Sequence, residues 1–235
     1  MNTIIIYIIS FIILIFLLFV VYILIPMFFK YFWRKRFLNK IERSGNIYLT
    51  FDDGPNPKIT IEILRILKEY NTKVTFFLLG QNVEKYSSVV DEIKKMGHAI
   101  GEHSYGHTHA WFTGPIRTAK DLLKGKRVIE KYLDGENKIL FRPPYGKMNL
   151  VTIMYVLFYR RIVAFWNIDP KDYFDKNENQ ISSYVLSKLK SGTIVLFHDN
   201  NIFRDSNSTE MVGALRLILE KTKETGIKFS SLNNI

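Results

Sequence analysis

The stretch YLTFDDGPNPK, residues 48–58, decides how the rest of the chain is interpreted. An apolar, β-prone run over residues 47–51 predicts a strand, and Gly54-Pro55 predicts that the strand ends there. Asp52 and Asp53 follow the run directly, and adjacent side chains on a strand point to opposite sides. Because neighbouring carboxylates repel each other, we expect a chemical role that needs both acids.

Short apolar runs alternate with amphipathic stretches beyond residue 46. The expected strands are residues 47–51, 74–79, 99–101, 139–141, 162–166, 193–197 and 227–229. The expected helices are residues 59–70, 83–96, 118–133, 150–160, 180–190 and 209–225. This alternation predicts an α/β fold with a parallel sheet, either a barrel or an open sheet.

Residues 4–29 contain no charged side chain and are almost entirely Ile, Leu, Phe, Val and Tyr. As a helix they would span about 39 Å at ~1.5 Å per residue, enough to cross a hydrocarbon core of ~30 Å with tilt. A cleaved signal peptide fits less well, because the start lacks a basic side chain and no small-residue cleavage site follows. We therefore expect a transmembrane anchor over residues 1–30, a basic juxtamembrane linker over 31–45 and a folded domain over 46–235. The predicted partner of residues 4–29 is the lipid bilayer.

The formal net charge is +11 and the isoelectric point is near 9.6. Part of this excess is a basic cluster just after the apolar run, which suits anionic lipid headgroups. The other lysines are scattered and match no nucleic-acid-binding motif, so no nucleic-acid partner is expected. The chain has no cysteine, which excludes disulfides and thiolate metal sites. By the positive-inside rule, the basic cluster favours a domain on the cytoplasmic side.

Polar motifs follow five of the expected strands: DDG, GEHSYGH, RPPYG, NIDPKDY and HDN. The carboxyl ends of parallel strands share one face of an α/β fold, and barrel enzymes place their active sites there. Within GEHSYGH, His103 and His107 are four residues apart, a spacing at which two imidazoles can converge on one metal. His98 and His109 lack such support and are expected to be solvated or packing residues. One acid of the Asp52-Asp53 pair can supply a third ligand, and the other can accept a proton from the attacking water.

Four further residues of these motifs suit hydrolysis. Arg142 offers a fixed cation that would orient an aspartate and keep it ionised. The prolines of the same motif stiffen the backbone that presents Tyr145, whose main-chain N–H could stabilise an oxyanion. His198 could protonate a leaving amine, and Asp172 could keep that imidazole cationic.

These motifs closely resemble the polysaccharide deacetylase family, also called the NodB homology domain or carbohydrate esterase family four. The similarity extends from about residue 46 to the end of the chain. It implies a distorted (β/α) barrel preceded by the transmembrane helix. It also implies that Asp52 is the catalytic base and Asp53 a metal ligand, with His103 and His107 as the other ligands. The spacing alone does not decide between the two acids.

The resemblance gives roles to the remaining motifs. Arg142-Pro143-Pro144-Tyr145 matches the family motif that orients the base, stabilises the oxyanion and forms the site wall. Leu196-Phe197-His198 matches the motif that supplies the general acid and a pocket-lining leucine. The motif that usually ends Asp-Trp reads Asp172-Tyr173 here, so the aromatic wall of the substrate groove is altered. The residue after His107, often proline in the family, is Thr108.

Together these features predict a metal-dependent carbohydrate N-deacetylase that releases acetate from N-acetylhexosamine residues of a cell-envelope polysaccharide, peptidoglycan-like or chitin-like. The expected metal is Zn²⁺, with Co²⁺, Ni²⁺ or Mn²⁺ as alternatives. This interpretation places the domain outside the cytoplasm, against the charge bias after the span. A domain facing the cytoplasm would instead act on a lipid-linked amino sugar. A third possibility within the fold is hydrolysis of another non-peptide C–N bond or of an ester bond. A sugar-binding module without catalysis is disfavoured, because base, ligands, arginine and acid are all present.

Overall fold

The computed structural model of the protein describes residues 3–133, 139–200 and 209–234. The strands are β1 (Ile47–Asp52), β2 (Thr75–Leu78), β3 (Ala99–Glu102), β4 (Leu140–Phe141), β5 (Ile162–Val163), β6 (Thr193–His198) and β7 (Phe229–Ser230). The α-helices are α1 (Thr3–Phe19), α2 (Ile25–Ser44), α3 (Ile59–Glu69), α4 (Gly80–Lys85), α5 (Ser87–Lys95), α6 (Pro115–Ile129), α7 (Leu150–Phe158), α8 (Glu178–Leu186) and α9 (Thr209–Glu224). A π-helical turn, η1 (Val20–Leu24), joins α1 to α2, and η2 (Glu130–Tyr132), η3 (Pro144–Gly146) and η4 (Leu232–Asn234) are short 3₁₀ turns.

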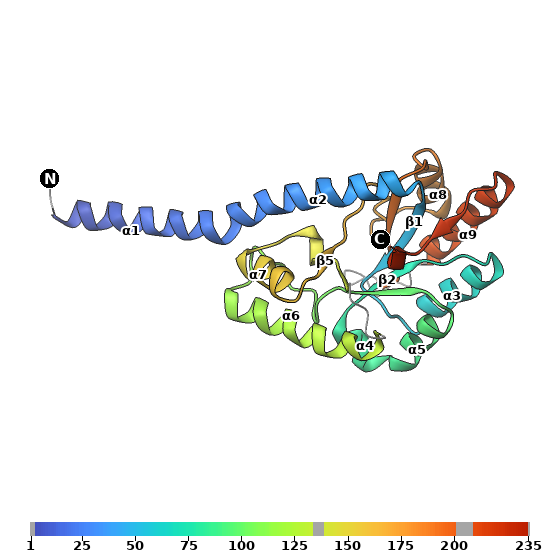
Figure 1. Ribbon diagram of the computed structural model, residues 1–235, viewed down its shortest axis with the longest axis horizontal. Coiled ribbons are helices and arrows are strands. Elements are labelled where there is room, and N and C mark those ends of the chain that lie inside the picture. The colour runs from blue at the N-terminus through green and yellow to red at the C-terminus, as the bar shows by residue number, and fades with distance from the viewer. Residues whose placement is uncertain (1–2, 134–138, 201–208, 235) are drawn as a thin grey trace.

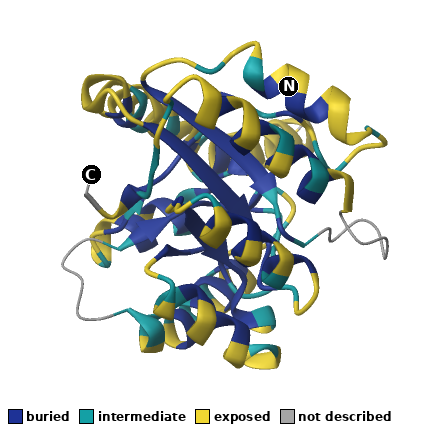
Figure 2. Cartoon of the chain, turned by 90° about the vertical axis from the view of Figure 1, so that its right-hand side faces the viewer, coloured by how far each residue is buried: buried dark blue, intermediate teal, exposed yellow. Residues whose placement is uncertain are grey.

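The strands form one parallel sheet in the order β5-β4-β3-β2-β1-β6, with β7 paired to the first residues of β1. Beyond β5 the chain returns to β6 through a single bridge between Ile168 and Val195. The sheet therefore curves into a distorted barrel, and this single bridge is the pairing that closes it. The observed fold confirms the predicted fold class. Helices surround the buried strands (Figure 2).

Burial on both faces explains why the strands are so apolar. All six residues of β1 are buried, as expected of a parallel strand that is covered on both sides. Phe51 stacks between Phe76 of β2 and Phe197 of β6, at ring distances of 5.2 and 5.7 Å. Helix α3 adds Ile63 and Leu67 to the same core cluster. These contacts fix β1 between β2 and β6, with its last residue, Asp52, and the following Asp53 at the sheet's carboxyl edge.

The N-terminal helix projects from the domain (Figure 1). From Thr3 to Ser44 the chain is helical, and this helix is long and apolar enough to cross a membrane, a property that a signal sequence shares. The residues of α1 are exposed, whereas Phe37 and Ile41 of α2 are buried in the second core cluster with Tyr48 and Phe165. The basic segment is thus helical as far as Ser44 and packs on the domain through its apolar face.

Three expected elements differ from those observed. The last strand, predicted over 227–229, is β7 at Phe229–Ser230. The helix predicted over residues 83–96 is two helices, α4 and α5, because Tyr86 adopts non-helical angles (φ −131°, ψ 47°). The strand predicted over 162–166 ends at Val163, because its partner β4 has only two residues and the chain then turns toward β6.

His98 is a packing residue: its ring lies edge-on to Phe76, and burial lowers its pKa to about 4.

Candidate active site

The register of the sheet brings the polar motifs to one edge. Asp52 of β1 is aligned with His198 of β6 and with Phe77 of β2. Farther along the sheet, the backbone N–H of His103 donates to Leu78 and that of Arg142 donates to Glu102. The residues that follow β1, β3, β4 and β6 therefore lie together, as the sequence predicted.

Asp53 has a left-handed backbone conformation (φ 74°), which is uncommon for a residue other than glycine. Such a conformation costs on the order of 1–3 kcal/mol and persists only where surrounding contacts hold it. The Nδ2 of Asn82, in α4, donates to the Asp53 carbonyl at 2.7 Å. This contact holds the turn in which Asp52 and Asp53 take different directions.

Asp53, His103 and His107 form a compact, mostly buried group. The Oδ1 of Asp53 lies 3.4 Å from Nε2 of His103 and 3.2 Å from Nε2 of His107. One potential ligand atom from each residue lies within 4.8 Å of the other two. The Nδ1–H of His103 donates to the Arg142 carbonyl at 2.7 Å, so Nε2 of the neutral ring keeps a lone pair. Two imidazoles and one carboxylate, with one ring already in the ligating tautomer, fit a divalent metal ion.

Asp52 lies between this group and Arg142. The Nη1 of Arg142 donates to Asp52 Oδ1 at 2.6 Å and to the Thr50 hydroxyl at 2.8 Å. Arg142 is fully buried, and its guanidinium lies 4.0 Å from the centre of the Phe77 ring. The second oxygen of Asp52 lies 3.8 Å from Nε2 of His103. Asp52 is therefore paired through one oxygen and directed at the metal-binding group through the other.

His198 is paired with Asp172 on the opposite side of the site. One oxygen of Asp172 lies 2.8 Å from His198 Nδ1, and the other accepts the His198 backbone N–H at 2.7 Å. Burial alone would favour the neutral ring, but the Asp172 carboxylate raises the pKa of His198 to about 10. Tyr173 stands edge-on to the same ring at 5.1 Å. His198 thus holds a proton at neutral pH.

Tyr145, which the sequence placed at the site, lies over the ring of His107 at 4.4 Å between ring centres. It has a left-handed backbone (φ 55°) in a 3₁₀ turn that begins at Pro144, and its side chain is 40 % exposed. Pro143, the residue directly before this turn, is buried. Leu196, two residues before His198 in β6, is also buried. On its other side, Tyr145 contacts His109, with 4.8 Å between the two ring centres.

Sequence reasoning did not assign Asp199, although the HDN motif contains it. Asp199 is fully buried, its Oδ2 accepts the Thr60 hydroxyl at 2.5 Å, and its backbone N–H donates to the Asp52 carbonyl at 3.2 Å. Burial raises its pKa to about 7. A Cβ on Gly54 would lie only 2.1 Å from an Asp199 oxygen, so glycine is required there. Asp199 supports the turn that carries Asp52 and Asp53, a role that only the folded chain reveals.

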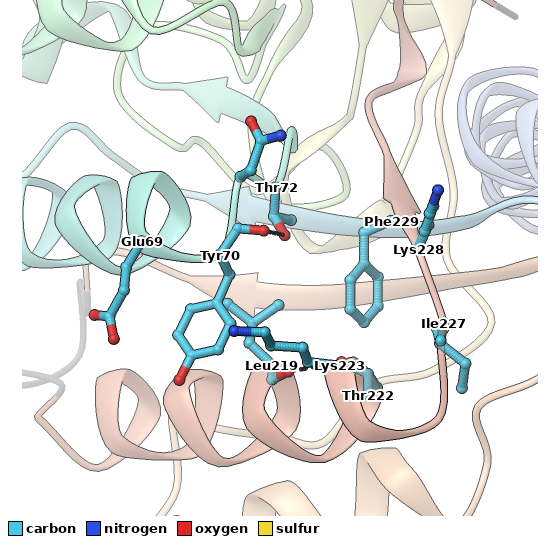
Figure 3. Close-up of a pocket in the computed structure, with 11 residues that line it drawn as sticks. Glu69, Tyr70, Thr72, Leu219, Thr222, Lys223, Ile227, Lys228 and Phe229 are labelled. Carbon is cyan, nitrogen blue, oxygen red and sulfur yellow. Dashed lines mark hydrogen bonds between the residues drawn. The ribbon is translucent and has the colours of Figure 1, made fainter.

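A separate groove lies at the amino ends of β1 and β2, away from the polar motifs (Figure 3). Its wall includes Tyr70, Thr72, Lys223 and Phe229. Among the described residues, the cluster with metal-ligating geometry is at the other edge of the sheet. The groove in Figure 3 therefore plays no part in the arrangement above.

A family model for polysaccharide deacetylases matches residues 39–157, which include the Asp52-Asp53 pair, both ligand-type histidines and Arg142. The chain belongs to the polysaccharide deacetylase family. A peptidoglycan-N-acetylglucosamine deacetylase of Bacillus cereus is 32% identical over 191 residues, which cover 80% of this chain and 87% of that protein. This polysaccharide deacetylase is accordingly a hydrolase that acts on N-acetyl groups of carbohydrates, in a metal-dependent family.

Solved structures agree with the fold of this deacetylase. The peptidoglycan deacetylase PdaC of Bacillus subtilis superposes with a TM-score of 0.69 at 32% identity, covering 80% of this chain and 88% of that one. A family-four pseudoenzyme of Bacillus anthracis gives 0.68 at 26% identity, covering 80% and 64%. The fold alone is thus compatible with loss of catalysis.

Removing the Arg142 cation should leave Asp52 as an unpaired buried charge. We expect Arg142→Met to lower the free energy of unfolding of this deacetylase by about 3–5 kcal/mol. Denaturant unfolding of the full chain in detergent would measure the change.

The matched control is Arg216→Met, since Arg216 pairs with Glu69 on the surface at 3.0 Å. That change should cost less than about 1 kcal/mol. The double variant Asp52→Leu/Arg142→Met should recover part of the loss. Equal losses in the Arg142 and Arg216 variants would contradict the importance of the buried pair.

Proposed function

We propose that this protein removes N-acetyl groups from N-acetylhexosamine residues of a cell-envelope polysaccharide of the peptidoglycan type, releasing acetate. The observation that carries the proposal is the Asp53-His103-His107 group, directly beside an aspartate that Arg142 holds in place. The names of the Bacillus relatives support peptidoglycan as the class of substrate.

Asp53, His103 and His107 would hold the metal ion, and we propose Zn²⁺, with Co²⁺, Ni²⁺ or Mn²⁺ as alternatives. When bound, such an ion supplies Lewis-acid polarisation of the substrate carbonyl and lowers the pKa of water. The lone pair of His103 Nε2 is directed by the hydrogen bond from its other nitrogen to Arg142. Burial of the three side chains keeps competing bulk water away from the site.

Asp52 is the proposed general base. One of its oxygens is held by Arg142, and the other, directed at the metal-binding group, can accept a proton from the attacking water. The Tyr145 main-chain N–H is the proposed donor to the carbonyl oxygen as negative charge develops there. Pro143, Tyr173 and Leu196 are the proposed walls of the substrate groove.

His198 is the proposed general acid. The C–N bond of the acetamide breaks as His198 delivers its proton to the departing nitrogen, and acetate and a free amino sugar leave. Asp172 acts on this step indirectly, because its carboxylate keeps the imidazole protonated and fixes its orientation. Water supplies the oxygen that ends in acetate and the proton that Asp52 accepts, and that proton makes good the one given by His198, so the reaction needs no other reactant.

The N-terminal helix is proposed as a single-pass membrane anchor over residues 4–29, with residues 46–235 as the catalytic domain. Peptidoglycan as substrate requires the domain outside the cytoplasm. The basic residues after the span favour the opposite orientation, in which a lipid-linked amino sugar would be the substrate.

Acetate release tests the proposed reaction. We expect the full chain in detergent to release acetate from peptidoglycan or N-acetylglucosamine oligomers, to lose this activity with chelator and to regain it with Zn²⁺. Asp52→Asn should lower kcat/KM by about 10²–10⁴, since it removes the proton acceptor. Asp91→Asn, at an exposed acid of α5, is the control and should leave the rate unchanged. Full turnover by the Asp52 variant would refute the mechanism.

Zn²⁺ titration tests the three proposed ligands apart from catalysis. His107→Ala should weaken binding by more than about 100-fold, because even changes behind the ligands cost ~10–100-fold. His109→Ala is the control, since His109 contacts Tyr145 but lies outside the ligand group. Equal affinities of the two variants would rule out His107 as a ligand.

The pH profile of kcat/KM tests the proposed acid. In the parent enzyme the Asp172 carboxylate raises the pKa of His198 to about 10, so the protonated acid persists into the alkaline range. In Asp172→Asn the burial of the ring is no longer opposed by this partner, and the pKa should fall. The alkaline limb should move to lower pH by roughly 2–3 units. An unmoved alkaline limb would mean that His198 does not supply the proton.

A further inference from the structure

Within the uncharged run the apolar helix is hydrogen-bonded to the catalytic domain through Tyr22, and Ile23 and Pro26 nearby are buried. The Tyr22 hydroxyl, in η1, donates to the Thr113 carbonyl at 2.9 Å and accepts from Nδ2 of Asn149 at 2.8 Å. Asn149 is fully buried, caps α7 and also donates to the Ala110 carbonyl at 2.8 Å. The starts of α6 and α7 are therefore tied to the helix at the level of Tyr22.

This level lies in the membrane if the helix spans it. A hydrocarbon core of ~30 Å takes about 20 helical residues, and the uncharged run covers residues 4–29. Every segment of that length within the run includes Tyr22. The domain residues that bind the Tyr22 hydroxyl must then lie at the hydrocarbon boundary, and Figure 1 shows α6 and α7 at the end of the domain from which α1 projects.

The surface at this end is apolar and exposed. Phe112 and Ile116, on either side of the Tyr22 contact, are 85 % and 72 % exposed. Met154, Leu157 and Phe158 share one face of α7 at helical spacing and are 60 %, 60 % and 79 % exposed. Ile116, Met154, Leu157 and Phe158 line one groove between α6 and α7. An apolar surface of this kind needs a partner.

The charges around the patch suit one class of partner. Arg117, Lys120 and Arg160 are exposed beside it, the acid of α6, Asp121, is buried, and α7 carries no charged residue. Apolar side chains flanked by cations without exposed carboxylates match the boundary between the headgroups and acyl chains of an anionic bilayer.

We propose that Phe112, Ile116, Met154, Leu157 and Phe158 form a membrane-docking patch that enters the bilayer surface beside the anchor. The inference rests on the proposed anchoring of residues 4–29 and adds that the domain itself contacts lipid. The catalytic domain is then held in one orientation at the membrane and does not swing on a flexible tether.

Spin labels test the patch, because the chain has no cysteine and single substitutions label cleanly. The full chain would be reconstituted in phosphatidylcholine vesicles containing phosphatidylglycerol, with a label at Phe16→Cys, Ile116→Cys, Met154→Cys or Lys68→Cys. Relative collision with oxygen and with a water-soluble nickel complex gives the depth of each label. We expect the Ile116 and Met154 labels about 5–10 Å inside the phosphate level. The Lys68 label, in α3 at the far end of the domain, should remain in water.

The Phe16 label separates the two ways of failing. If it reports hydrocarbon while the Ile116 and Met154 labels report water, the anchor stands and the docking patch is refuted. If the Phe16 label itself reports water, the anchoring fails and the docking inference fails with it. Spectral broadening at Met154 that disappears on dilution with unlabelled protein would show that a second copy covers the patch, which also overturns the proposal.

Discussion

The buried ion pair between Arg142 and Asp52 is the interaction on which the candidate site depends. Its guanidinium holds Asp52 at 2.6 Å, and the carbonyl of the same arginine accepts the Nδ1–H of His103 at 2.7 Å. A single residue after β4 thus fixes both the proposed base and the tautomer of a proposed ligand. Because a buried guanidinium is costly without a partner, this arrangement tolerates loss of neither side chain.

The two aspartates of the opening motif have separate environments because the backbone turns between them. Asp52 ends β1 with strand geometry, whereas Asp53 is left-handed and held by Asn82. One carboxylate is therefore neutralised by an arginine and the other faces two imidazoles. The expected repulsion between the two carboxylates is relieved because each has different partners. The backbone N–H of Asp199 also donates to the Asp52 carbonyl and so supports the turn.

The sequence predicted the parallel sheet and the shared edge because these follow from local patterns. Continuous apolar runs mark strands that are buried on both faces, and Asp52, His103, Arg142 and His198 each follow one directly. The break at Tyr86 carried no such pattern, since neither glycine nor proline marks it. Asn149 and Asp199 were also missed, because each acts through contacts between distant segments. Only the folded chain brings those segments together.

The path from the site to the anchor is short, and this constrains where the substrate meets the enzyme. His107, a proposed ligand, is six residues before Thr113, the residue that accepts the Tyr22 hydroxyl. Six extended residues reach at most about 20 Å. The rings of His107 and His109, within this segment, both contact the ring of Tyr145. Under the proposed anchoring, which places Tyr22 inside the span, the proposed ligands lie within roughly 20 Å of the hydrocarbon boundary. The same proposal implies that a glycan comes to the membrane surface to be deacetylated, whichever side of the bilayer the domain faces.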